Sequence, residues 1–162
     1  MTTDAPRTRQ QRIADTLAML RSPACDAWVA SASSDDDGAA QPYLVPLSLV
    51  WWRERVVLAL PASSRTARNV VASLSTRLAL GHTRDVVLVD AVVEQTVPVA
   101  DAQADLGERY AAQADWDPRT DPDGYVYLVL RPVRIQAWRE VDEMRGRNLM
   151  RDGEWVESGP EL

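Results

Sequence analysis

"YLVPLSLVWWRERVVLAL" (residues 43–60) decides the fold class of this sequence. Two runs rich in β-branched and aromatic residues are separated only by Arg53 and Glu54. This pattern predicts two antiparallel strands joined by a tight hairpin. Pro46 lies inside the first run and lacks the N–H group that a central strand needs. We therefore expect that strand to run along an edge or a bulge there, with something other than a neighbouring strand beside it.

Helical and strand patterns alternate along the rest of the chain. Helices are expected at 8–21, 64–75 and 100–113, and strands at 26–32, 43–52, 55–60, 77–81, 86–99 and 125–138. Most consecutive strands are joined by short turns, which favours antiparallel pairing. The sequence thus predicts one mainly β domain over residues 1–162, a six-stranded barrel or curled sheet with about three helices. Residues 1–22 would hold the first helix, and residues 141–162 form a polar tail without a clear pattern.

Composition narrows the classes of function. The 162 residues carry a net charge of −6, so long-range attraction to nucleic acid or to an anionic membrane surface is not expected. No apolar run is long enough to span a bilayer, and the N-terminus lacks an apolar signal core. One cysteine and one histidine favour a cytoplasmic protein and argue against a metal site. A cytoplasmic protein that handles a small molecule is expected.

Residues 61–74, "PASSRTARNVVASL", concentrate cations and hydroxyl groups where a helix is expected to begin. Its two faces would be Ala67, Val70, Val71 and Leu74 on one side and Arg65, Arg68 and Asn69 on the other. Either Ser63 or Ser64 is a suitable N-cap, and the first turn contains no acidic residue. Free N–H groups, hydroxyls and guanidinium groups all suit a phosphate. A solvated arginine face is the competing interpretation, because arginine is the only basic residue type in this chain besides His82.

Other polar and aromatic residues have simpler interpretations. His82 lies in a predicted turn, where an exposed side chain is a simpler interpretation than an acid or a hydrogen-bond donor. Cys25 is expected to be a buried small residue. The aspartates at 35–37 and at 117–123 lie in loop-like segments. Trp51 and its neighbour in sequence should point to opposite faces of one strand.

Taken in order, the segments resemble the pyridoxamine 5′-phosphate oxidase-like superfamily of FMN-binding split β-barrels, which includes F420-dependent reductases. The matching segments are "DAWVASAS", "YLVPLSLVWWRERVVLAL", "SSRTARNVVASLSTRLALG", "RDVVLVDAVVE", "YVYLVLRPVRIQAWRE" and "LMRDGEW". The resemblance covers residues 24–156. It implies a six-stranded antiparallel split barrel and a homodimer with cofactor sites at the subunit interface.

The resemblance also implies roles for individual residues. Arg65, Thr66, Arg68 and Asn69 would hold the phosphate with help from Ser64, and Pro46, Leu47 and Ser48 would lie along the cofactor ring. Trp138 and the tail would cover the site from the other subunit. Many relatives carry a lysine beside the phosphate-binding arginine, whereas this chain has Thr66 there, which leaves the cofactor open between FMN and F420. The arginine-rich C-terminal signature of genuine pyridoxamine phosphate oxidases is not found.

Two functions are consistent with these residues. The first is an oxidoreductase that binds FMN or F420 and passes hydride to a small organic acceptor, in which the cofactor carries the redox chemistry. The second is a carrier or sensor that binds flavin or haem without turnover. The polyanionic tail of F420 would need a longer basic groove than FMN, for which Arg65, Arg68 and Arg77 are the candidates.

Overall fold

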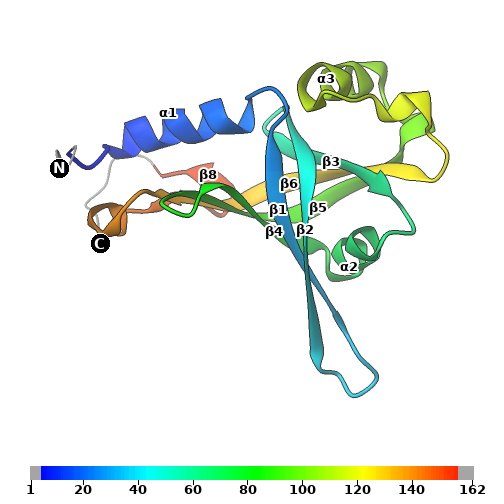
Figure 1. Cartoon of the computed structure of the whole chain (residues 1–162), viewed down its shortest axis with the longest axis horizontal. Helices are drawn as coiled ribbons and strands as arrows, with labels where there is room; N and C mark the ends of the chain where they lie inside the picture. Colours follow the sequence, from blue (N-terminus) through cyan, green and yellow to red (C-terminus); the bar gives the residue numbers. More distant parts are fainter. Residues whose placement is uncertain (1–4, 157–162) are drawn as a thin grey trace.

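A closed six-stranded antiparallel β-barrel forms the body of the protein, as a computed structural model that describes residues 5–156 shows. The strands are β1 (Asp26–Ser34), β2 (Ala40–Trp52), β3 (Arg55–Pro61), β4 (Ser75–His82), β5 (Asp85–Pro98) and β6 (Tyr125–Trp138). They lie in the order β3-β2-β1-β4-β5-β6, and pairing of β3 with β6 closes the ring. The helices are α1 (Arg9–Leu20), α2 (Arg65–Ser73) and α3 (Ala104–Ala114). Figure 1 shows α1 over one half of the molecule and the other two helices at the opposite half.

The tight hairpin that the sequence predicts joins β2 to β3. Arg53 and Glu54 both have positive φ, 47° and 59°, and Trp52 pairs with Arg55. Two consecutive left-handed residues make the turn type whose twist matches that of the flanking strands. The expected order of helices and strands is confirmed.

Strand β2 has two partners in succession. Its residues 40–48 pair with β1, and its residues 49–52 pair with β3. The first part of β2 therefore leaves the ring with β1 and extends beyond it as a two-stranded arm, residues 31–43, which Figure 1 shows projecting away from the barrel. The acidic loop at its tip is a turn, because the Asp35 carboxylate accepts backbone hydrogen bonds from Asp37 and Ala39.

Alternating residues of the strands divide the core into two parts. One face of each strand points into the barrel, where Trp51, Leu58 and Leu128 are buried. The other face of β2, β3 and β6 carries a second cluster, which α3 covers with Leu106 and Tyr110. Trp51 belongs to the first cluster and Trp52 packs against the second, as expected for neighbours on one strand.

The C-terminal segment, in which no clear pattern was found, adds two short strands beside the barrel. β7 (Asn148–Arg151) pairs with β6 and β8 (Glu154–Trp155) pairs with β7, so within residues 5–156 the predicted six-stranded barrel is confirmed and two further strands extend its sheet. Short 3₁₀ turns stand at Val99–Asp101, Pro118–Thr120 and Val141–Glu143. The remainder of the expected tail, residues 157–162, lies outside the described residues.

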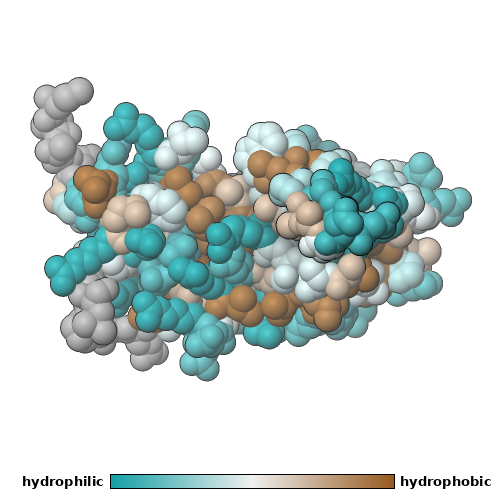
Figure 2. All heavy atoms as spheres, turned by 90° about the horizontal axis from the view of Figure 1, so that it is seen from below, coloured by the Kyte–Doolittle hydropathy of each residue, from teal (hydrophilic) through white to brown (hydrophobic). Residues whose placement is uncertain are grey.

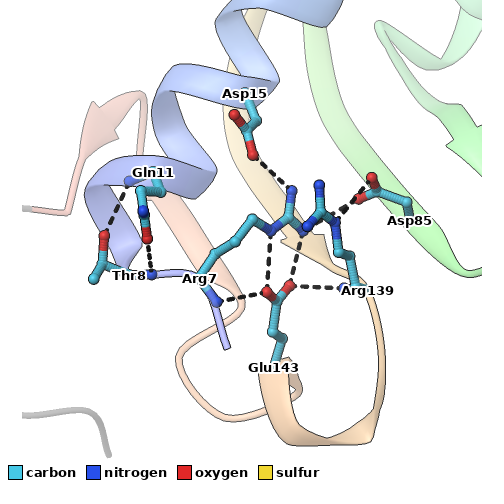
Figure 3. A network of polar contacts seen from close by, with 7 residues as sticks. All are labelled: Arg7, Thr8, Gln11, Asp15, Asp85, Arg139 and Glu143. Carbon is cyan, nitrogen blue, oxygen red and sulfur yellow. Dashed lines mark hydrogen bonds and ion pairs between the residues drawn. The ribbon is translucent and has the colours of Figure 1, made fainter. Parts of the chain in front are cut away.

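A buried carboxylate ties the N-terminal segment to this C-terminal one. Glu143 accepts hydrogen bonds from the backbone and side chain of Arg7, at 2.8–3.0 Å, and from the Arg139 backbone at 2.8 Å. Arg7 also reaches Asp15 and Asp85, which Figure 3 shows on α1 and at the start of β5. The hydrogen bonds from Arg7 lower the pKa of Glu143 to about 2.

The surface carries both hydrophobic and hydrophilic residues. Figure 2, which views the molecule from the side to which the arm points, shows hydrophobic residues in small groups between hydrophilic ones. None of the helices within residues 5–156 is both long and apolar enough to cross a bilayer.

Candidate functional site

The cationic segment of the sequence stands at the start of α2. Ser64 is the N-cap, with extended backbone angles, and its hydroxyl accepts a hydrogen bond from the Ala67 backbone N–H at 3.1 Å. No acidic residue occupies the first turn of this helix. The partial positive charge of the helix start is therefore not compensated by a side chain of α2 itself.

Two exposed arginines flank this helix start. The guanidinium carbon of Arg65 lies 4.7 Å from the centre of the Tyr43 ring on β2, a cation–π contact. Arg68 donates to the backbone carbonyl of Ser63. Neither arginine forms an ion pair with a carboxylate anywhere in residues 5–156. Their charges are thus available to an external anion.

The buried face of α2 differs from the expected one. Ala67 and Val70 enter the core as predicted, but Val71 and Leu74 are 41% and 59% exposed. Thr66 and Asn69 are buried instead. Because the helix is only nine residues long and Leu74 turns left-handed after it, the face toward the barrel is rotated, and its polar Asn69 donates to Ser31 of β1 at 3.2 Å.

A pocket of about 310 Å³ lies where β2 and β3 separate. One wall consists of Pro46, Leu47 and Ser48, and the other of Ala59, Leu60 and Pro61. The backbone of Ser64 donates to the carbonyl of Pro61 at 2.9 Å, so this pocket directly adjoins the start of α2. The structure therefore brings the predicted ring-contacting strand and the predicted phosphate-binding helix to neighbouring positions.

The proline in β2 is explained by the direction of its missing N–H group. The N–H of Leu49 donates to Cys25 of β1, so by alternation the odd residues of β2 point toward β1 and the even ones away from it. Pro42 and Pro46 are both even, and each faces a residue of β1 in a position without ladder hydrogen bonds. On the side away from β1, only residues 49–52 of β2 pair with a strand, β3, within the described sheet. Pro46 therefore lies at an open edge on that side, as predicted.

A tyrosine hydroxyl holds the two strands at the point of separation. Tyr110 of α3 accepts from the backbone N–H of Ala59 at 3.2 Å and donates to the carbonyl of Ser48 at 3.4 Å. Burial raises the pKa of Tyr110 well above its usual value, so the hydroxyl stays protonated. It therefore substitutes for the missing ladder bonds and forms the floor of the pocket.

Sequence reasoning missed the aromatic wall of this pocket. Trp116 and Tyr125 line it beside Tyr110, and the indole ring stands edge-on to both, with centroids 5.8 and 5.9 Å away. Asp115 ends α3 in a left-handed conformation, which turns the chain back toward the strands. Trp116 remains 38% exposed. The only available signal was a group of aromatic residues in a turn-rich segment, whose position in space depends on the packing of α3.

Three other residues lie away from this pocket. Trp138 is at the opposite end of β6 from Tyr125, roughly 40 Å along the strand at ~3.3 Å per residue. Within one chain it therefore does not meet the pocket, and its contribution from a second subunit stays a prediction. The Arg77 guanidinium donates two hydrogen bonds to the Asp90 carboxylate, at 2.5 and 2.9 Å. His82 is exposed at the end of β4, as expected.

No protein-family model matches the sequence, and a search of curated proteins returns no match. Solved structures do match. The chain is similar to an F420 reductase, with 20% identity and a TM-score of 0.54 over 73% of this chain and 93% of that one. It is also similar to a heme-binding protein from Mycobacterium smegmatis, with 17% identity and a TM-score of 0.59 over 93% of this chain and 60% of that one.

A third match is a protein from Listeria innocua provisionally named pyridoxamine 5′-phosphate oxidase. It shares 10% identity, with a TM-score of 0.58 over 82% of this chain and 98% of that one. Identities at this level show a shared fold and transfer no ligand or activity to this chain.

Proposed function

We propose that this chain, which has the pyridoxamine 5′-phosphate oxidase-like split β-barrel fold, binds a flavin-type cofactor and acts as an oxidoreductase on a small organic acceptor. The observation that carries the proposal is the adjacency of two features. An aromatic-walled pocket lies between diverging strands, and beside it a helix start carries Arg65 and Arg68, neither of which has a carboxylate partner among the described residues.

The helix start suits the phosphate of such a cofactor. The backbone N–H groups of the first turn, the Ser64 hydroxyl and the two guanidinium groups form a donor set without acidic side chains. The present contacts of the arginines are a tyrosine ring and one backbone carbonyl, both weaker partners than a phosphate dianion. Thr66 and Asn69 are buried on the barrel side, so we assign them a positioning role and the direct contacts to Arg65 and Arg68.

The pocket suits a flat heterocycle. Pro46 and Pro61 supply apolar walls, Trp116 supplies an indole surface, and the unpaired edge of β2 presents the backbone N–H of Ser48. Planar rings that carry several hydrogen-bonding groups bind well between apolar walls with a few fixed polar partners. When bound, a flavin-type ring would supply hydride transfer, while the protein would hold the ring in place and exclude water.

FMN fits this donor set better than F420. The polyanionic tail of F420 would need further free cations near the helix start. Arg77 was the third candidate, but Asp90 already compensates its charge. Arg65 and Arg68 match the demand of a single phosphate.

We further propose that the active form is a homodimer. Trp28 and Leu44, on neighbouring strands at the base of the arm, are 52% and 57% exposed, which is unusual for such large apolar side chains and fits a covered surface. A second copy seated there would lie next to the pocket and could bring Trp138 and its C-terminal segment to it. Light scattering of the purified protein, with Leu44→Glu as the disrupting variant, tests this assembly.

The absorption spectrum of protein purified from its native host tests the cofactor. FMN, F420 and haem have distinct visible bands. An FMN spectrum that is bleached by a chemical reductant and restored by an added acceptor supports the oxidoreductase. A haem band, or bound flavin that no acceptor reoxidises, would favour the carrier or sensor.

A further inference from the structure

The barrel wall has a second opening, separate from the pocket between β2 and β3. On one side of β6, β3 pairs with residues 125–130 and β7 pairs with residues 135–136. Between them this edge of β6 has no strand partner in the described sheet, and Pro132 there lacks an N–H group. We call this gap the window. It is bordered by the β2–β3 turn on one side and by the β7–β8 hairpin on the other.

A pocket of about 660 Å³ fills the window, within the usual range for small-molecule sites. Trp51 and Met150, both about 5% exposed, belong to the barrel core and form its floor. Trp155 of β8, half-buried, forms a side wall. The Trp51 backbone is fixed from the other face of the sheet, where Gln113 and Arg109 bind its N–H and carbonyl at 3.2 Å. Its side chain lies in the barrel-interior cluster, where it lines the window.

Both indoles pack against the barrel core, and their contacts there are with aliphatic side chains rather than with rings or cations. Within residues 5–156, neither Trp51 nor Trp155 forms a ring–ring contact, and no cation lies over either ring. The tryptophan ring is the best side-chain partner for a positive charge. The window thus offers the half-buried ring of Trp155 at its side and the small exposed part of Trp51 at its floor.

The charges at the rim favour the same kind of ligand. Arg55 is neutralised by Glu94, with Nη2 3.3 Å from Oε1. Glu54 and Glu154 are exposed carboxylates of the pocket rim, and no ion pair engages either within the described chain. Arg131 opposes them with its Nη1 over Gly153 of the β7–β8 turn, and its charge also acts on Glu94. Three carboxylates, Glu54, Glu94 and Glu154, against the guanidinium groups of Arg55 and Arg131 leave a net negative rim on a protein of net charge −6.

We propose that the window is a second ligand site, for a small organic cation with an aromatic or apolar body, such as an amine. The body would enter between Trp51 and Trp155, and the ammonium group would face the indoles and the carboxylates of Glu54 and Glu154. This site and the pocket beside α2 have no lining residue in common. The proposal is therefore independent of the cofactor assignment.

The test compares probes of the same shape and opposite charge. Ligand-observed NMR titrations with phenethylamine and with phenylacetate give two dissociation constants for the full chain. We expect phenethylamine to bind at least about tenfold more tightly, with no displacement by FMN. Equal or tighter binding of phenylacetate, or no saturation by either probe, overturns the proposal.

Substitutions of charged residues at the rim test the same site without changing the tryptophans of the core. Glu154→Gln should weaken phenethylamine binding severalfold, and Arg131→Gln should tighten it, since both side chains are exposed and their removal leaves the core intact. Glu140→Gln, an exposed carboxylate paired with Arg84 and outside the lining, is the matched control and should change nothing. Weaker amine binding in Arg131→Gln, or no change in Glu154→Gln, refutes the assigned charge preference.

Discussion

Replacing Glu143 by glutamine removes a buried negative charge on which several donors converge. The carboxylate is 3% exposed and receives four hydrogen bonds, three from Arg7 and one from the Arg139 backbone. A neutral amide would turn an NH₂ group toward donors and leave the Arg7 guanidinium undercompensated. We expect the Glu143→Gln variant to fold with a lower free energy of unfolding.

The magnitude follows from the pKa. Hydrogen bonds from Arg7 lower the pKa of Glu143 from an ordinary 4.5 to about 2, and each pKa unit corresponds to about 1.4 kcal/mol. Because Arg7 shares its charge with Asp15 and Asp85, the part that belongs to the Glu143 charge is roughly 2–3 kcal/mol at pH 7. Because the folded-state pKa is depressed, this stability is fully present above about pH 4.5 and is lost as pH falls toward 2.

Urea unfolding of both proteins at pH 7 and pH 3, followed by circular dichroism, measures this difference. We expect the gap between wild type and Glu143→Gln to shrink to roughly half at pH 3. Glu140→Gln is the control, because its ion pair with Arg84 is solvent-exposed and should contribute little to stability. A gap at pH 7 no larger than that of the control, or a gap independent of pH, would refute the reasoning.

Three further predictions concern the pocket and the backbone. Trp116→Ala should weaken FMN and riboflavin binding equally, by about tenfold or more, in fluorescence titrations, and unchanged affinities would contradict the assignment of this pocket. Tyr110→Phe should lower the free energy of unfolding by about 1–2 kcal/mol, measured in urea, because the Ser48 and Ala59 backbone groups lose their partner. Gly81→Ala should lower the melting temperature of the protein much more than Gly124→Ala. Both glycines have positive φ, but only at Gly81 would a Cβ overlap a carbonyl oxygen of β5. Equal melting temperatures of the two variants would contradict this.

Local patterns in the sequence were sufficient for the order of the elements. Alternation and turn chemistry act over a few residues, so the hairpin at Arg53 and Glu54 and the edge position of Pro46 could be predicted. The rotation of α2 could not, because a short helix takes its orientation from the barrel end on which it packs. Its stripe of Val71 and Leu74 remains outside the core.

The candidate site was predictable only in part. The cations at Arg65 and Arg68 stand out in an acidic chain, and they do lie exposed at a helix start. The Trp116 wall and the Tyr110 clamp depend on where α3 folds against the diverging strands, which is long-range information. Likewise, the pairing of Arg77 with Asp90 across two strands depends on a register that the sequence does not display.

The proposed function rests on direct contacts of Arg65 and Arg68 with a phosphate group. Calorimetric titration of FMN, with riboflavin in parallel, into the wild type and into the Arg65→Ala/Arg68→Ala double variant tests it most directly, since both side chains are exposed. We expect the double variant to lose about 3 kcal/mol or more of FMN affinity, while riboflavin, which has no phosphate, should bind both proteins alike. Unchanged FMN affinity, or an equal loss for riboflavin, would contradict it.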